Sequence, residues 1–223
     1  MDKKLIISAF SKFFLGVILV GALLFVPAGT LQYKEAWLFL AVLFIPMFIV
    51  GIILMFKDPD LLRSRLNAKE KVGTQKKIVG FSGLMFLVAF ILAGLNCRFG
   101  WNSLPEGVIY GAVAVFLIAY LLYGEVLREN SYLSRTIEVR EGQTVVDTGL
   151  YGIVRHPMYM ATIFLFLSIP FILNSLYSFF VMLLYIPVII KRLLNEEEFL
   201  KKELPGYEEY MQKVKYRIIP FIY

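Results

Sequence analysis

Hydrophobic positions along the chain gather into five long stretches separated by short polar segments. Ala36 to Phe56, for example, contains 21 residues and no charge. As an α-helix it would be about 32 Å long, which is enough to cross a hydrocarbon core of about 30 Å. The stretches are Leu5–Val26, Ala36–Phe56, Ile78–Leu95, Gly107–Tyr123 and Met158–Ile190.

The last stretch is too long for one helix, because it runs for about 33 residues without a charge. Asn174-Ser175 near its middle is a turn signal, and Pro170 and Pro187 interrupt regular helix. We therefore predict two helices joined by a tight turn. Each half is short for a full crossing, so the pair is expected to tilt or to continue beyond Ile190. The chain then has about six transmembrane helices, the last two a helix-turn-helix hairpin.

Composition supports a bilayer as the solvent of this chain. It is 59% hydrophobic and 18% charged, whereas soluble domains carry about 25% charged residues. With one cysteine, Cys97, and one histidine, His156, disulfide scaffolds and metal sites built on several such residues are excluded. We predict an all-α integral membrane protein with no metal. Its single membrane domain, 1–223, divides into N-terminal helices at 1–127 and a cofactor-binding and catalytic region at 128–223.

The charges predict the topology. With the N-terminus in the cytosol and six crossings, all but two of the 23 Lys and Arg residues fall on the cytosolic side, the exceptions being Lys34 and Arg98. The positive-inside rule then predicts a multi-pass protein with both termini in the cytosol. This accounts for the net charge of +6, so no nucleic-acid partner is expected. The first stretch is longer than the apolar part of a signal peptide, about 7–15 residues, and is expected to remain as an anchor.

Two polar inserts interrupt the predicted helices. Residues Lys57–Lys77 are interpreted as a solvated loop near anionic head groups. Within Glu125–Pro157, alternation at Thr136–Arg140, a turn at Glu141-Gly142 and the run Thr144–Val146 predict a short β-hairpin.

The C-terminal tail, Phe199–Tyr223, has apolar residues near helical spacing and predicts a cytosolic amphipathic helix lying on the membrane surface. Pro205-Gly206 is expected to interrupt that helix.

Ionisable residues gather where the last two helices meet the cytosol. Pro157 suits the first position of a helix, which places His156 near an N-cap, where backbone N–H groups and the dipole favour an anion. Arg155 adds a cation. A ligand carboxylate or phosphate could bind there, and the alternative is that Arg155 and His156 only anchor the helix end in the head-group layer.

A second cluster follows the last apolar helix. Arg192 and Glu196 are four residues apart and share a helical face. A plain surface ion pair is one interpretation, but ionisable groups at the apolar edge of a membrane helix are often functional.

The order of these motifs resembles the isoprenylcysteine carboxyl methyltransferase family. The resemblance covers residues 130–223 and implies a membrane methyltransferase that uses S-adenosylmethionine. It rests on Gly149-x-Tyr151-x-x-x-Arg155-His156-Pro157-x-Tyr159, then about thirty apolar residues, then Arg192-x-x-x-Glu196-Glu197, Gly206-Tyr207-x-x-Tyr210 and Tyr216-Arg217-Ile218-Ile219-Pro220.

Site roles follow from this resemblance. Arg192 would orient the carboxylate of an isoprenylcysteine-like or other lipidic acceptor at the cytosolic face, and Glu196 would bind the cofactor. An acceptor carboxylate is ionised at neutral pH, so no general base is required. The other implied cofactor-binding residues are Gln143, Thr144, Val145, Val146, Tyr151, His156, Pro157, Met158 and Tyr159.

Three alternatives stay open. Phospholipid N-methyltransferases resemble the same pattern, and Glu197 would then be the base that deprotonates the amine. The ending Tyr216–Tyr223 and the R-H-P motif also resemble membrane sterol reductases that use NADPH, although those proteins usually carry Lys-Tyr-Gly and a Trp before the final Tyr. The third alternative is a non-catalytic membrane protein, either a scaffold or a small transporter.

Overall fold

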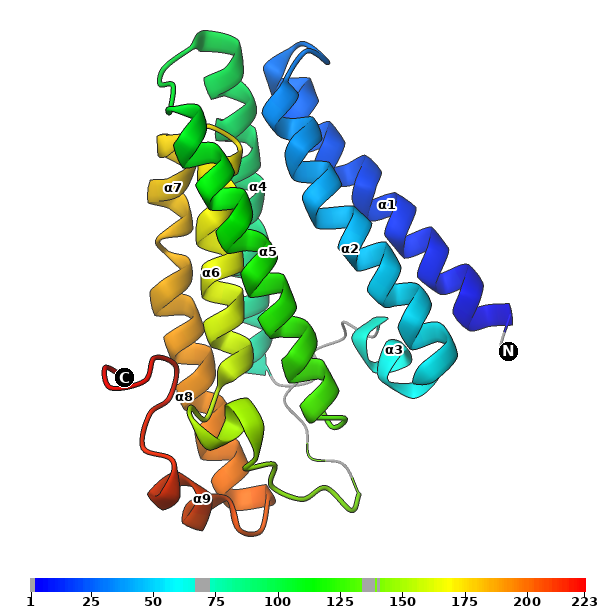
Figure 1. The fold of residues 1–223 in the computed structure, drawn as a ribbon, viewed down its shortest axis with the longest axis vertical. Helices are drawn as coiled ribbons and strands as arrows, with labels where there is room; N and C mark the ends of the chain where they lie inside the picture. The colour runs from blue at the N-terminus through cyan, green and yellow to red at the C-terminus, as the bar shows by residue number, and fades with distance from the viewer. Residues whose placement is uncertain (1–2, 67–72, 134–138, 140) are drawn as a thin grey trace.

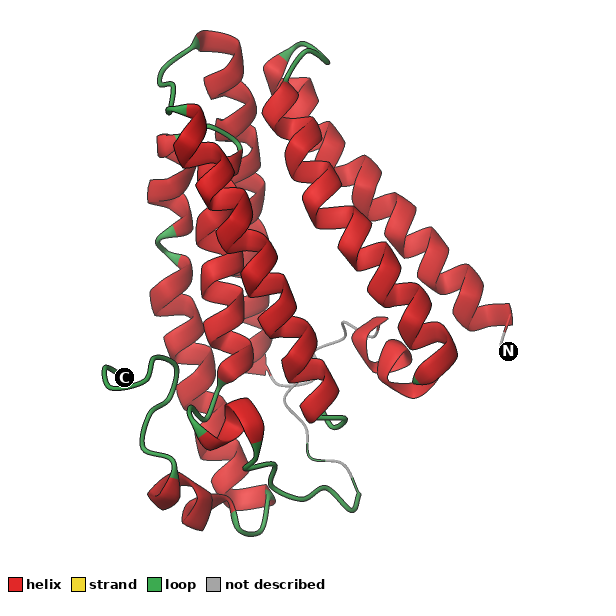
Figure 2. Ribbon diagram, viewed as in Figure 1, coloured by secondary structure: helices red, strands yellow, loops and turns green. Residues whose placement is uncertain are grey.

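The computed structural model describes residues 3–66, 73–133, 139 and 141–223. Throughout these residues the regular structure is helical (Figure 2), and the chain is an all-α membrane protein of several passes. Five helical segments are long and apolar enough to cross a bilayer, and a shorter apolar helix accompanies them. This agrees with the predicted six helices.

The first two helices form a hairpin. Helix α1 spans Lys3–Ala28 and α2 spans Lys34–Lys57. Gly29 follows α1 with φ of 67°, and its N–H donates to the carbonyls of Phe25 and Val26. A glycine just beyond the helix end supplies this left-handed conformation at little cost.

The insert after α2 contains a helix rather than only the solvated loop predicted there. Helix α3 spans Pro59–Leu66. Asp58 starts it, because its carboxylate accepts from the N–H of Leu61 at 2.9 Å, and Pro59 needs no such partner at a first position. The ammonium of Lys12 on α1 donates to the carbonyl of Leu66 at 2.7 Å. The charge of Lys12, which interrupts the first apolar stretch, thus binds the C-terminal end of α3.

The remaining helices form one bundle (Figure 1). Helix α4 spans Gly73–Phe99 and α5 spans Glu106–Glu129. After a segment with one 3₁₀ turn, η1 at Gly149–Gly152, come α6 at Pro157–Ile172, α7 at Leu176–Met182, α8 at Tyr185–Glu203 and α9 at Tyr207–Lys213.

The predicted split of the last apolar stretch is confirmed. Asn174 takes φ of 57° in the turn, and the hydroxyl of Ser175 caps α7 by accepting from Ser178 N. Helix α7 runs on into α8 after a break at Leu183 and Leu184. Pro187 has no N–H to donate to the carbonyl four residues earlier, which explains why regular helix is interrupted there.

Two expectations for the polar segments were wrong in part. Glu141-Gly142 is a turn, but Thr144–Val146 is irregular rather than a strand, while residues 136–138 and 140 lie outside the described part of the chain. The C-terminal tail is interrupted at Pro205-Gly206 as predicted. It does not continue as a surface helix, however, because after α9 it turns back to the start of α6.

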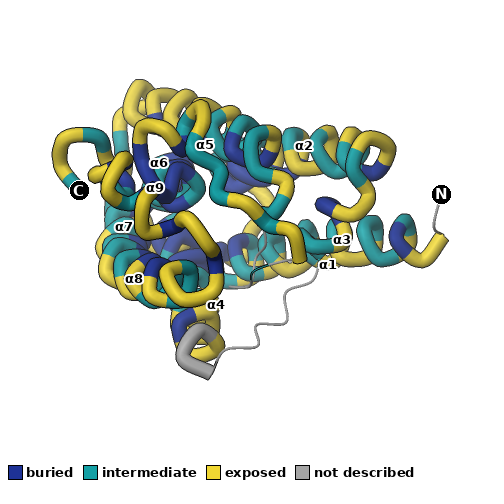
Figure 3. Tube along the Cα trace, turned by 90° about the horizontal axis from the view of Figure 1, so that it is seen from below, coloured by how far each residue is buried: buried dark blue, intermediate teal, exposed yellow. Residues whose placement is uncertain are grey.

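The membrane core lies where α1, α2, α4, α5 and α6 meet, around Leu24, Phe39, Phe90, Phe116 and Ile172. Gly94 allows α4 to approach α1 closely, because a Cβ there would lie 2.5 Å from the Leu24 carbonyl oxygen. Small residues serve this purpose in many membrane helix pairs. Figure 3 shows how much of α1 and α2 is exposed, as expected for helices that face lipid.

The two chain ends lie at the same end of the bundle, together with α3, η1 and α9 (Figure 1). The α1–α2, α4–α5 and α6–α7 turns lie at the other end. This matches an even number of crossings. Which end faces the cytosol stays a prediction.

Candidate functional site

A pocket opens at the polar end of the bundle. It is bounded by the end of α5, the segment before η1, η1 itself, the start of α6, the charged part of α8, and α9. Its lining residues are Asn130, Tyr132, Leu133, Gln143, Thr144, Val145, Val146, Tyr151, Arg155, His156, Met158, Tyr159, Glu196, Leu200, Leu204, Tyr207 and Tyr210.

The segment that carries η1 is held against α5. Gly149 has φ of 51°, and its Cα faces the carboxylate of Glu129 so closely that a Cβ would collide with it. That carboxylate accepts from the N–H of Leu150 at 2.9 Å. Asn130 donates to the hydroxyl of Tyr151 at 3.1 Å. The end of α5 thereby positions Tyr151 in the pocket wall.

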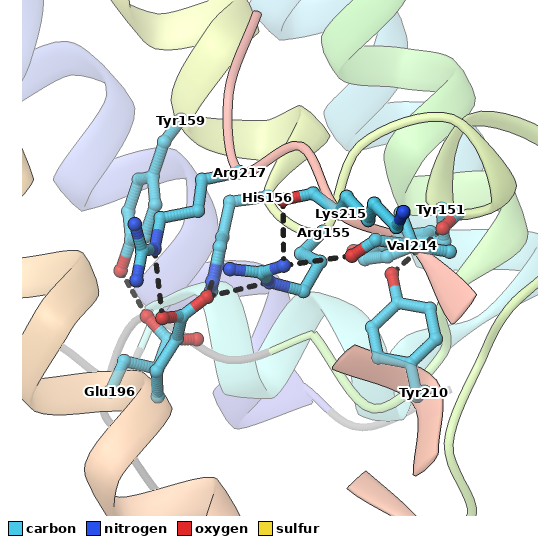
Figure 4. A network of polar contacts seen from close by, with 10 residues as sticks. Tyr151, Arg155, His156, Tyr159, Glu196, Tyr210, Val214, Lys215 and Arg217 are labelled. Atoms are coloured by element: carbon cyan, nitrogen blue, oxygen red, sulfur yellow. Dashed lines mark hydrogen bonds and ion pairs between the residues drawn. The ribbon is translucent and has the colours of Figure 1, made fainter. Parts of the chain in front are cut away.

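Two of the lining residues, Arg155 and His156, belong to a polar network that also includes Arg217 (Figure 4) and that centres on the buried Glu197. Arg155 Nε donates to Oε1 of Glu197 at 2.7 Å, and Arg217 Nε donates to Oε2 at 3.0 Å. His156 Nε2 lies 3.3 Å from Oε1. Arg155, His156 and Glu197 are each at most 6% exposed, so their charges and polar atoms depend on one another for hydrogen bonding.

The same arginine also ties the tail to α6. Nη1 of Arg155 donates to the carbonyls of Val214 and Lys215. The backbone N–H groups of Arg155 and His156 donate to the carbonyls of Tyr216 and Arg217, at 2.9 and 2.8 Å. The Arg-His pair and the Tyr-Arg pair of the sequence motifs are thus neighbours through their backbones. This part of the motif holds the fold around the pocket.

A second polar group faces the pocket from α6 and α8. The hydroxyl of Tyr159 donates to Glu196 Oε2, and Arg192 Nε donates to the Tyr159 oxygen at 3.3 Å. Tyr159 is 3% exposed, and its ring stacks on that of His156 with centroids 5.5 Å apart. A phenol is therefore held between a carboxylate and a guanidinium.

Helix α9 contributes two buried tyrosines. The hydroxyl of Tyr210 donates to the carbonyl of Tyr151 at 2.7 Å, as Figure 4 shows. Within the described chain, the hydroxyl of Tyr207 has no hydrogen-bond partner, although Tyr207 is only 4% exposed. Burial raises the pKa of both phenols, so both remain protonated at neutral pH.

Most of the predicted site residues meet in this pocket. Gln143, Thr144, Val145, Val146, Tyr151, His156, Met158, Tyr159 and Glu196 all line it. Pro157 begins α6 directly after His156, which is the N-cap as predicted. Arg192 is connected to these lining residues by its hydrogen bond to the Tyr159 oxygen. The interpretation of Arg155 as a simple head-group anchor was wrong, because its guanidinium is buried and paired with Glu197.

Sequence reasoning missed several lining residues. Asn130, Tyr132 and Leu133 follow the end of α5 and carry no motif of their own, whereas Leu200, Leu204, Tyr207 and Tyr210 were assigned to a surface helix. The helical spacing of the last four was a usable signal, but it does not say against what they pack. Among the described residues no group of three or more metal-binding side chains is found.

The C-terminal part of the chain is similar to known proteins. Residues 126–223 match the sequence profile of the "Ergosterol biosynthesis ERG4/ERG24 family". The chain is also 33% identical over 91 residues to the Delta(14)-sterol reductase TM7SF2 of Mus musculus. That match covers 40% of this chain and 22% of the relative, so the shared segment spans about a fifth of the relative's length.

These matches correct the interpretation of the sequence motifs. The resemblance to isoprenylcysteine carboxyl methyltransferases was wrong, and with it the expected methyl transfer and S-adenosylmethionine as cofactor. Residues 126–223, which match the family profile, contain the segment on which that resemblance rested. The R-H-P and Tyr-Arg-Ile-Ile-Pro motifs are a poor guide to the cofactor, because Arg155, His156, Tyr216 and Arg217 hold one another through their backbones and through Glu197.

Proposed function

We propose that the chain is a membrane reductase that uses NADPH to reduce a carbon–carbon double bond of a sterol-like lipid. One observation carries this proposal. Every lining residue of the pocket lies between Asn130 and Tyr210, inside the segment that matches the sterol reductase family. The similarity therefore falls on the residues that would bind a ligand, and residues 128–223 are proposed as the catalytic region of a single membrane domain.

The residues of the pocket fit a nicotinamide dinucleotide. Tyr151, Tyr207 and Tyr210 contribute aromatic rings to its wall, and Asn130 and Thr144 contribute uncharged polar groups. Helix α6 begins beside the pocket, and the positive end of its dipole favours an anion there, although the N–H groups of Tyr159 and Met160 donate to the His156 carbonyl. Arg155 is not proposed as a phosphate ligand, because its guanidinium is used by Glu197 and by two backbone carbonyls.

Bound NADPH supplies a hydride, and reduction of a double bond also needs a proton on the second carbon. We assign that proton to the hydroxyl of Tyr159. The guanidinium of Arg192 donates to the phenol oxygen and would stabilise the phenolate that remains after proton transfer. In this structure Glu196 accepts the hydrogen bond of that hydroxyl, so the O–H must turn from Glu196 to the substrate carbon before it gives up its proton.

The place of the pocket suits an apolar substrate. Met158 and Tyr159 line it from the first turns of α6, and the apolar part of that helix leads directly into the membrane core. On this proposal a lipid enters the pocket from the bilayer side, and a polar cofactor enters from the end of the bundle that carries α9. Apolar walls with a few placed polar groups are typical of small-molecule sites.

The test is a reductase assay on the purified protein in lipid nanodiscs. With NADPH and a sterol that has a double bond at position 14, we expect loss of the reduced nicotinamide absorbance and a product that has gained two hydrogen atoms by mass spectrometry. Tyr159→Phe should lower the rate by about 10²-fold or more, because it removes the proton donor. Tyr110→Phe, on an exposed position of α5, serves as the matched control.

Two results would contradict the proposal. One is a wild-type protein that shows no binding of NADPH by calorimetry. The other is NADPH oxidation that does not depend on any sterol with a reducible double bond. A normal rate in Tyr159→Phe would leave the reductase function in place and remove Tyr159 as the proton donor.

A further inference from the structure

Tyr207 and Tyr210 lie three residues apart on α9, but their hydroxyl groups differ in hydrogen bonding. Both line the pocket, both are buried, and their rings contact each other with centroids 5.7 Å apart. The Tyr210 hydroxyl is used inside the protein by the Tyr151 carbonyl, whereas the Tyr207 hydroxyl has no partner among the described residues. A buried hydroxyl without a partner costs about 1–3 kcal/mol, so its presence calls for a ligand.

The surroundings of the Tyr207 hydroxyl restrict which kind of ligand atom can accept its hydrogen bond. Burial, followed by the charges of Glu197 and Glu196, raises the pKa of Tyr207, so the phenol stays protonated and can donate a hydrogen bond. Glu196 would repel a phosphate at this point, while the charge of Glu197 is offset by Arg155 and Arg217. An uncharged acceptor oxygen fits the position better than an anion.

The position also suggests which half of a dinucleotide is involved. Glu196, whose charge acts on Tyr207, is the residue that holds Tyr159. If Tyr159 provides the proton, the hydride donor must lie near it. We propose that the Tyr207 hydroxyl donates a hydrogen bond to an uncharged oxygen on the nicotinamide half of the bound cofactor, such as the carboxamide oxygen. This inference rests on the proposed reductase function.

The experiment compares binding by calorimetry for wild type, Tyr207→Phe and Tyr110→Phe. The probes are NADP⁺ and adenosine 2′,5′-bisphosphate, which lacks the nicotinamide half. Tyr207→Phe should raise the Kd for NADP⁺ about three- to tenfold, the range of one neutral hydrogen bond, and leave the Kd for the bisphosphate unchanged. Tyr110→Phe should alter neither Kd.

Thermal unfolding of the ligand-free protein separates a binding role from a structural one. Tyr207→Phe should unfold at the wild-type temperature or above it, because no internal hydrogen bond is lost. Tyr210→Phe should unfold at a lower temperature, because it leaves the Tyr151 carbonyl without its donor.

Each of the other possible outcomes would overturn one part of the proposal. An unchanged Kd for NADP⁺ in Tyr207→Phe, or a lower unfolding temperature, removes the ligand-binding role of Tyr207 and leaves the proposed function standing. An equal loss for both probes moves the contact to the adenosine half, and a loss far above tenfold indicates a charged acceptor. A wild-type protein that binds neither probe overturns the proposed function together with this inference.

Discussion

Arg155 and Glu197 are 42 residues apart in the sequence, yet Nε of the first donates to Oε1 of the second at 2.7 Å, with both side chains buried. The pair joins the start of α6 to α8. Through two further bonds of Arg155 to backbone carbonyls, it also joins the C-terminal tail to both helices. The pocket exists because these three segments meet.

Breaking this pair should destabilise the protein strongly. Glu197→Gln keeps the shape of the side chain but leaves the Arg155 charge buried without a counter-ion. We expect a loss of about 3–5 kcal/mol in the free energy of unfolding, measured in mixed micelles by helical circular dichroism. Asp147→Asn, which breaks the exposed pair with Lys213, should leave the transition unchanged. Equal effects of the two substitutions would show that the cluster adds no stability.

The contact of Gly149 with Glu129 predicts a selective effect of adding one methyl group. Gly149→Ala should displace the Glu129 carboxylate from Leu150 N and weaken binding of NADPH, because Tyr151 lies in the same short turn. Gly142→Ala is the matched control, since Gly142 also has a positive φ, 72°, but nothing lies within 4 Å of its Cβ position. The prediction fails if calorimetry finds the same NADPH affinity in both variants.

The close approach of α1 and α4 predicts that Gly94→Ala lowers the unfolding temperature. Its Cβ would lie 2.5 Å from the Leu24 carbonyl oxygen and 3.1 Å from Ala28 N, and backbone atoms cannot move aside locally. Gly83→Ala on the same helix has open space, and should be neutral or stabilising by up to about 1 kcal/mol through helix propensity. A stable Gly94→Ala protein would mean that the two helices pack less closely than the structure shows.

Alkaline pH should destabilise the protein through its buried tyrosines outside the membrane. Burial raises the pKa of Tyr151, Tyr207 and Tyr210, whereas in the unfolded chain a tyrosine ionises near pH 10. Above about pH 10 the unfolded state therefore binds fewer protons than the folded state, and stability falls as the pH rises.

Each such tyrosine contributes a slope of up to about 1.4 kcal/mol per pH unit. Unfolding followed between pH 8 and 11.5 should show full stability below about pH 10 and a decline above it. Tyr207→Phe should make that decline shallower. The same slope in the variant and in the wild type would show that Tyr207 ionises normally in the folded protein.

The charge distribution predicts the orientation in the membrane. In a Cys97→Ala background, a membrane-impermeant maleimide added to sealed cells should label Lys34→Cys and not Lys201→Cys. Lys34 begins α2 at the end of the bundle that is poor in cations, and Lys201 lies in the last turns of α8 at the opposite, polar end. The reverse pattern would place both termini outside, and labelling of both positions would contradict the even number of crossings.

Hydrophobic runs and turn residues were sufficient to predict the long apolar helices. The boundary at Asn174-Ser175, the helix start at Pro157 and the interruption at Pro205-Gly206 all follow from local rules about caps, turns and proline, and the structure has each of them. Asp58-Pro59 gave a similar local signal for α3, but the surrounding charges favoured a solvated loop. A short helix held by Lys12 from another helix cannot be recognised from its own segment.

The sequence also placed nine of the residues that line the pocket, but it attached the wrong chemistry to them. Arg155, His156 and Glu197 form a buried cluster, which the partly exposed Arg217 joins, and this cluster holds the fold. A motif that serves the fold does not specify a cofactor. Similarity of residues 126–223 to the ERG4/ERG24 family was needed to overturn the expected methyl transfer.

By itself, the sequence determined a helical membrane protein with about six apolar helices and the segments rich in functional groups, because these depend on hydrophobicity and on local backbone preferences. Tertiary structure alone decided which polar groups satisfy one another. Tyr207 and Tyr210 have the same side chain in neighbouring turns of one helix, but the Tyr151 carbonyl accepts from Tyr210, and the Tyr207 hydroxyl has no partner in the described part of the chain. Which hydroxyl remains without an internal partner depends on the segment that contains Tyr151, about sixty residues away in the chain. A local sequence pattern cannot predict this contact.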